Sequence, residues 1–183
     1  MNIKKYKKIG VVTDEDFGVQ IVKNRNQPKL RYGARGIVFN ENNEVAVFFK
    51  KLKKEYKLPG GGIEDGESPK DSFKRECEEE LGVKIDIVDF LGTIEEVQSQ
   101  TNFKQISYVF VAKVIEKTKQ NLTQMEKDEG ATSLWVNIDE ALNLISSCIN
   151  DLRASNYESV YSTKFIVLRD RKILEYYLNN NEN

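Results

Sequence analysis

Residues 61–83 read GGIEDGESPKDSFKRECEEELGV, and they contain the densest charge in the chain. Eight of these side chains are acidic and three are basic, whereas the whole chain has a net charge of −1. Carboxylates crowded in this way repel one another unless a cation lies among them. Hard divalent cations such as Mg²⁺ take oxygen ligands. The stretch therefore predicts a site for a divalent cation in an otherwise near-neutral protein.

The second half of the stretch, residues 68–82, predicts a helix. Ser68 is a suitable N-cap, and Pro69 at the first helical position loses no hydrogen bond. Gly82 can end the helix in a left-handed conformation. Apolar side chains recur every four residues and predict the buried stripe of the helix. They are Phe73, Cys77 and Leu81.

The carboxylates of this helix fall on the opposite face. Residues three and four positions apart share a face, so Glu76, Glu79 and Glu80 converge on one patch. Arg75 precedes Glu79 by four residues and can hold its carboxylate in one rotamer. Glu67, just before the helix, can hydrogen-bond the glycine turn or Arg75. A merely solvated acidic face would not explain the glycine turn or these fixed offsets.

Composition limits the chemistry that the chain can perform. The chain has 183 residues, of which 39% are hydrophobic and 31% charged, as is typical of a soluble globular domain with extensions. It has no histidine and only two cysteines, Cys77 and Cys148. Without histidine and with only two cysteines, a structural zinc site and a Ser-His-Asp hydrolase are excluded. The small number of cysteines also makes a disulfide framework unexpected, which favours a protein of the reducing cytoplasm.

Charge and hydropathy also limit the partners that we expect. The 28 basic residues nearly balance the 29 acidic ones, which gives no strong attraction to nucleic acid. No apolar run approaches the length of a membrane span, and the N-terminal residues lack a signal-peptide pattern. We therefore expect neither a membrane nor a nucleic-acid partner.

The rest of the sequence predicts strands and helices on both sides of the motif. Strands are expected over residues 34–40 and 45–51 as a hairpin, over 83–97, 103–115 and 133–138, and at an edge within 17–24. Helices are expected over residues 138–149, with Asn137 as the cap, and over 163–178. Residues 116–132 are expected to form a loop, and residues 179–183 a disordered tail.

Together, the glycine turn and the helix resemble a known motif. The stretch resembles the Nudix box. It has Gly61, then five residues, Glu67, seven more residues, and the run RECEEELGV over 75–83. The one soft position is Cys77, where an aliphatic residue is more usual. The resemblance implies an α/β fold, a Nudix-type α/β/α sandwich with a mixed β-sheet.

The resemblance also suggests how the chain is divided. We expect an N-terminal extension or edge strand over residues 1–30 and a Nudix hydrolase domain over 31–150. Residues 151–183 are expected to form a linker, a helix packed on the domain, and the disordered tail.

The Nudix family hydrolyses phosphoanhydrides, so the resemblance implies an activity as well. The expected reaction is Mg²⁺-dependent cleavage in a nucleoside diphosphate linked to a group X, with Mn²⁺ as an alternative cofactor. Arg75 would orient the metal ligands, while Glu67 and Gly82 would have structural roles. The metal ligands implied by the family are Glu76, Glu79, Glu80 and the carbonyl of Gly61.

Other catalytic and binding residues are expected outside the box. In this family the base that activates water is a Glu in the box or in a later loop. Our loop candidate is Glu129, followed by Glu126. Arg35 and Lys57 are expected to contact substrate phosphates, because Arg and Lys neutralise phosphate charge. Four strand aromatics could stack a base. They are Tyr32, Phe39, Phe49 and Tyr108.

The box leaves the substrate open. Enzymes that remove oxidised nucleoside triphosphates often have Lys where Gly62 stands, and ADP-ribose hydrolases often have a proline that residues 94–103 lack. We expect a nucleoside triphosphate or modified nucleotide. The alternatives are an ADP-ribose or nucleotide-sugar pyrophosphatase and a non-catalytic nucleotide-sensing module, although the intact box favours an enzyme. The family also allows a homodimer.

Overall fold

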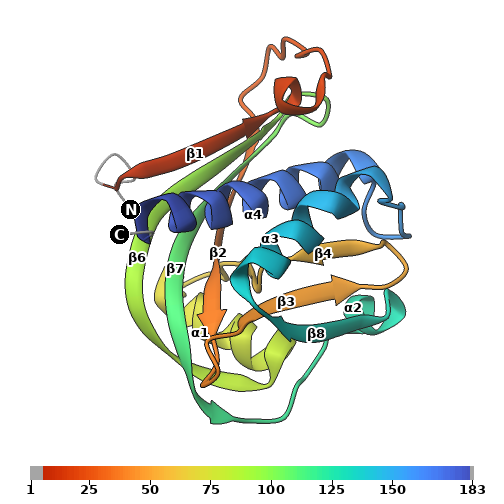
Figure 1. Ribbon diagram of the computed structural model, residues 1–183. Coiled ribbons are helices and arrows are strands. Elements are labelled where there is room, and N and C mark those ends of the chain that lie inside the picture. The colour runs from red at the N-terminus through yellow and green to blue at the C-terminus, as the bar shows by residue number, and fades with distance from the viewer. Residues whose placement is uncertain (1–5, 182–183) are drawn as a thin grey trace.

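The computed structural model describes residues 6–181, whose strands form one mixed sheet (Figure 1). The strand order is β1-β6-β7-β2-β3-β4, with β5 beside β2 and β8 beside β3. The strands are β1 (Lys8–Thr13), β2 (Lys29–Phe39), β3 (Val45–Lys50), β4 (Glu55–Lys57), β5 (Gly60–Gly62), β6 (Val83–Gln98), β7 (Phe103–Lys117) and β8 (Ala131–Val136). The helices are η2 (Asp14–Phe17), α1 (Pro69–Leu81), α2 (Gln124–Asp128), α3 (Ile138–Ser147), η3 (Cys148–Asn150) and α4 (Val160–Asn181), of which η2 and η3 are 3-10 helices.

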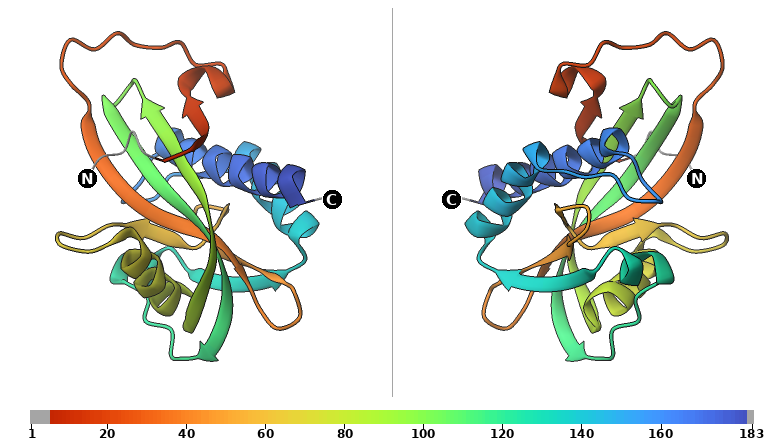
Figure 2. Two further views of the ribbon diagram at one scale, coloured as in Figure 1. Left: turned by 90° about the vertical axis from the view of Figure 1, so that its left-hand side faces the viewer. Right: turned by 90° about the vertical axis from the view of Figure 1, so that its right-hand side faces the viewer.

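The helices cover both faces of the sheet. Helix α1 lies on one side, and α3 and α4 lie on the other (Figure 2). Phe73 and Cys77 of α1 pack against Ala34 and Val38 of β2. On the opposite face, buried side chains of α4 pack against the sheet strands and Leu58. This arrangement is the α/β/α sandwich that the sequence predicts.

The sheet opens between β2 and β3. Strand β2 pairs with β7 in parallel along its whole length, from Lys29 to Phe39. It pairs with β3 only at Phe39 and Val45, so the expected hairpin is paired only at its turn. The three glycines of β5 pair with residues 33–35 of β2 and line the opening. A cleft can therefore form where the two parts of the sheet diverge.

Helix α1 forms as its sequence predicts. The Ser68 side chain accepts a hydrogen bond from the Asp71 backbone N–H, and Pro69 occupies the first turn. Gly82 ends the helix with a φ of 65°, in the left-handed region where glycine is favoured. Phe73 and Cys77 are fully buried and Leu81 nearly so.

Two expectations about the ends and loops are wrong. Residues 17–24 form no strand, and their Ile21 and Val22 side chains are exposed. The edge strand is β1 instead, because its backbone pairs in parallel with β6. The expected loop over residues 116–132 contains α2, which a Thr123–Glu126 capping box nucleates.

The tail prediction is also wrong for residues 179–181, which continue α4. Asn180 and Asn181 donate side-chain hydrogen bonds to the carbonyls of Tyr176 and Tyr177, one turn earlier. Residues 182–183 lie outside the described part of the chain. Within the described part, no helix has the length and hydropathy needed to cross a membrane.

Candidate active site

A cavity of about 900 Å³ lies between α1, β5 and α4. This volume is near the upper end of the range of ~300–1,000 Å³ typical of small-molecule sites. Glu76, Glu79 and Glu80 of α1 line one wall, together with Gly61 of β5. The structure therefore brings the predicted metal ligands to a single cavity.

Arg75 forms ion pairs with several acidic side chains at this wall. Its Nε and Nη2 donate to the two carboxylate oxygens of Glu67 at 2.9 and 3.1 Å, a bidentate pair. Its Nη1 donates to Glu76 Oε1 at 2.9 Å and to Glu79 Oε2 at 3.1 Å. The hydrogen bonds to Glu67 are the largest cause of the raised pKa of Arg75. Arg75 is thus permanently charged and ties the loop before α1 to its carboxylates.

Glu80 lies deepest, with only 2% of its surface exposed. Lys57 Nζ donates to Glu80 Oε1 at 2.6 Å, and the Gly60 N–H donates to Oε2 at 2.8 Å. Burial, with a further contribution from the charge of Glu76, raises the pKa of Glu80 to about 7. Lys57 therefore neutralises Glu80, and its ammonium is not free for a substrate phosphate as we had expected.

The wall has the donors that a hard cation requires. Glu76 and Glu79 each use one oxygen for Arg75 and have a second oxygen that accepts no hydrogen bond within residues 6–181. A Cβ at Gly61 would lie 2.3 Å from Glu76 Oε1, so only glycine lets this carboxylate approach β5. Burial raises the pKa of Glu79, and the nearby Glu76 charge adds to the shift.

Mg²⁺ or Mn²⁺ would fit this all-oxygen set. In the part of the chain that the structure describes, these carboxylates do not form a group with metal-binding geometry. Instead, Arg75 bridges Glu76 and Glu79, and Lys57 pairs with Glu80. A bound cation would compete with Lys57 for Glu80.

The predicted base Glu129 does not reach the cavity. It is 1% exposed, its Oε2 lies 2.8 Å from Lys50 Nζ, and its Oε1 accepts a hydrogen bond from Ser155. This buried ion pair keeps the Glu129 carboxylate out of the cavity. Glu126, our second candidate, lines the cavity instead, and its charge contributes to the raised pKa of Glu79.

Arg35, the predicted phosphate contact, lies in the cavity wall and is buried. Only 4% of its surface is accessible, and its Nε donates to Ser107 Oγ at 3.1 Å. Burial, followed by the nearby charge of Arg169, lowers the pKa of Arg35 to about 10. The nearby carboxylates of Asp170, Glu96 and Glu80 partly offset these effects on the pKa of Arg35.

Sequence reasoning missed part of the cavity. Lys29 and Arg31 of β2, Gln105 of β7 and Arg169 of α4 all line it. Residues 29, 31 and 35 alternate along one face of the strand, and this spacing could have revealed Lys29 and Arg31. No local pattern marks Arg169, because α4 reaches the cavity only through the tertiary fold.

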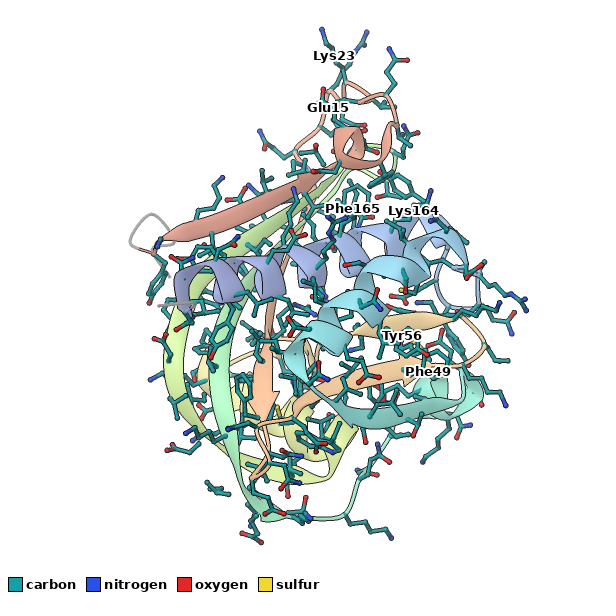
Figure 3. All side chains as sticks on the ribbon, in the orientation of Figure 1. Glu15, Lys23, Phe49, Tyr56, Lys164 and Phe165 are labelled. Carbon is teal, nitrogen blue, oxygen red and sulfur yellow. The ribbon has the colours of Figure 1, made fainter. Side chains whose placement is uncertain are left out.

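The aromatic residues expected to stack a base do not line the cavity. Phe49 stacks on Tyr56 of the neighbouring strand with ring centroids 4.3 Å apart (Figure 3). Tyr108 is 2% exposed and packs near Phe90. Phe103 and Tyr157 line the cavity instead.

Fold and site together define a hydrolase that acts on pyrophosphate bonds. A model of the NUDIX domain matches residues 29–153, and the chain therefore belongs to the Nudix family.

Two curated proteins are similar to parts of this chain. The methanol dehydrogenase activator of Bacillus methanolicus is 29% identical over 136 residues, covering 73% of this chain and 70% of that protein. The 8-oxo-dGTP diphosphatase of Proteus vulgaris is 31% identical over 65 residues, covering 33% of this chain and 58% of that protein.

Solved structures share the fold at low identity. A NUDIX hydrolase from Nitrosomonas europaea has a TM-score of 0.59 and 15% identity, covering 83% of this chain and 90% of that one. A UDP-X diphosphatase has a TM-score of 0.52 and 17% identity, covering 87% of this chain and 67% of that one.

Proposed function

We propose that the protein is a Mg²⁺-dependent pyrophosphohydrolase that cleaves a phosphoanhydride bond of a nucleoside diphosphate derivative. The observation that carries this proposal is the convergence of the box carboxylates and the buried Arg35 on one cavity. A polyanionic substrate is repelled by carboxylates alone, so the acidic wall requires cations between itself and the phosphates.

Glu76, Glu79 and Glu80 would hold the divalent cation, with the Gly61 carbonyl as a further ligand. When bound, such a cation polarises phosphoryl oxygens and lowers the pKa of a water nucleophile. The chain's own residues prepare that geometry. Arg75 fixes the carboxylates of Glu76 and Glu79 through its Nη1.

Other residues would act on the substrate or position the ligands. Lys57 holds Glu80 in place until metal binds. Arg35 would contact a phosphoryl group, since its guanidinium fork matches phosphate oxygens. Glu126 would take a proton from the attacking water, because its carboxylate lies in the cavity and near Glu79.

We further propose that the substrate is a nucleoside triphosphate or modified nucleotide. The partial match to an 8-oxo-dGTP diphosphatase supports this choice. Nucleotide sugars and ADP-ribose stay the second candidates. A homodimer, a cytoplasmic location and the lack of a nucleic-acid partner stay predictions.

A nucleotide panel tests the proposal. Purified protein is incubated with nucleoside triphosphates, oxidised triphosphates, ADP-ribose and UDP-sugars, each with Mg²⁺ or with EDTA. We expect release of a nucleoside monophosphate from at least one compound, with Mg²⁺ only. No turnover of any compound with Mg²⁺ would contradict the proposed activity, and equal turnover in EDTA would contradict the metal requirement.

A further inference from the structure

One face of β2 presents a row of cations to the cavity. Alternate residues of a strand point to the same face, and Lys29, Arg31 and Arg35 follow this spacing, with Gly33 between them. All three basic side chains line the cavity. Within residues 6–181, none of them has a carboxylate within 4.0 Å.

The other cations of the cavity are already engaged. Lys50 pairs with Glu129, Lys57 with Glu80, and Arg75 with three carboxylates. The β2 row therefore supplies most of the positive charge that is available to a ligand.

Gly33 has no side chain and therefore leaves room for the Arg35 guanidinium. A Cβ at this position would lie 3.3 Å from Arg35 Nη2 and 3.5 Å from Gln105 Nε2. The Arg35 guanidinium thus folds back over Gly33 towards Gln105, which is paired in register with Arg31. The Arg31 guanidinium lies over Gly62 of β5, where a Cβ would be 2.5 Å from its Nη2. Because Gly62 is the register partner of Gly33, Arg31 and Arg35 approach the same part of the cavity.

Helix α4 adds a third guanidinium there. Arg169 is 1% exposed, donates through Nη1 to Glu96 and lies 2.7 Å from Asp170 Oδ1 through Nε. Gln105 donates to the same Glu96 oxygen at 3.3 Å, which places Arg169 beside Gln105, towards which the Arg35 guanidinium points. Arg169 Nη2 is buried and has no hydrogen-bond partner in the described chain. Glu96 and Asp170 offset the charge of Arg169 but leave this donor unused.

We propose that Arg31, Arg35 and Arg169, the guanidinium cluster, bind a phosphoryl group of the substrate beyond the two that flank the scissile bond. This inference rests on the proposed function and deepens it. The substrate class is then a nucleotide with a third phosphoryl group, either in the phosphate chain or on X. Arginine suits this role because it presents planar, bidentate donors to phosphate oxygens.

Binding of inorganic polyphosphates in EDTA tests the cluster without turnover. Isothermal titration compares pyrophosphate with tripolyphosphate on wild type, Arg31→Met, Arg169→Lys and the control Arg171→Met. Arg171 lies on α4 but pairs with Glu175 at the surface. Arg169→Lys keeps the charge beside Glu96 and Asp170, and thermal unfolding confirms that each variant is folded.

We expect wild type and Arg171→Met to bind tripolyphosphate about tenfold more tightly than pyrophosphate, which corresponds to about 1.4 kcal/mol. Arg31→Met and Arg169→Lys should lose most of this preference. Equal affinities in wild type, no tripolyphosphate binding, or an equal loss in Arg171→Met would overturn the proposal. Because the assay needs no metal and no chemistry, its failure differs from a failure of the nucleotide panel.

Discussion

Arg75 shows at the scale of single residues how one side chain can organise a site. Its guanidinium contacts Glu67, Glu76 and Glu79 and also donates to the Gly62 carbonyl. Helical spacing predicted the contact with Glu79, and the sequence offered Arg75 as one of two partners for Glu67. The contact with Glu76 was expected only through the family resemblance, in which Arg75 orients the metal ligands. The burial of Glu129 could not be predicted, because its partners Lys50 and Ser155 are distant in the sequence.

A pair of variants separates the two loop carboxylates. Glu126→Gln should lower kcat by about 10²–10⁴-fold, the usual contribution of a general base, while the amide oxygen retains the α2 cap. Glu129→Gln should instead destabilise the fold by about 3–5 kcal/mol, because Lys50 is left buried without its partner. Steady-state kinetics and urea unfolding of both variants provide the measurement. The opposite pattern would restore Glu129 as the base.

At the scale of elements, α1 was predictable almost to the residue. Its cap, its first proline, its apolar stripe and its terminal glycine are all local signals. Strand β1 and helix α2 were missed for different reasons. A six-residue strand at the sheet edge depends on its partner β6, and a five-residue helix is too short for a hydrophobic period.

Gly82 provides a test of how α1 ends. A Cβ at Gly82 would lie 2.8 Å from the Gln120 backbone nitrogen, whereas a Cβ at Gly18 would meet nothing within 4 Å. Both glycines have positive φ, 65° and 72°, so alanine at either costs about 1–2 kcal/mol in backbone strain. Gly82→Ala should therefore be clearly more destabilising than Gly18→Ala in urea unfolding. Equal losses would show that Gly82 matters for its conformation alone.

At the scale of the whole molecule, the N-terminal and C-terminal parts of the chain are held together. Asp14, the first residue of η2, is fully buried and accepts hydrogen bonds from Tyr161 of α4 and from the Ser99 N–H. Phe17 packs edge-on against Phe165, also of α4. The sequence predicted a C-terminal helix, but it did not show that this helix joins the cavity to the edge strand.

The Tyr161 contact predicts how stability depends on pH. Burial, together with the hydrogen bond to Asp14, raises the pKa of Tyr161 to about 12, whereas an unfolded tyrosine titrates near 10. Between these values the unfolded chain releases a proton that the folded chain retains, so stability falls as the pH rises. Tyr161→Phe should weaken this fall when urea midpoints are compared below and within that window. An unchanged pH dependence would contradict the assignment.

The central claim for the molecule is that the α1 carboxylates hold the cation that drives hydrolysis. Glu79→Gln and Glu78→Gln test it most directly, because they remove neighbouring charges from the same helix and only Glu79 lines the cavity. With the best substrate of the panel and Mg²⁺, Glu79→Gln should lose turnover by orders of magnitude with unchanged thermal stability, while Glu78→Gln should match wild type. Near-normal turnover by Glu79→Gln would contradict the account.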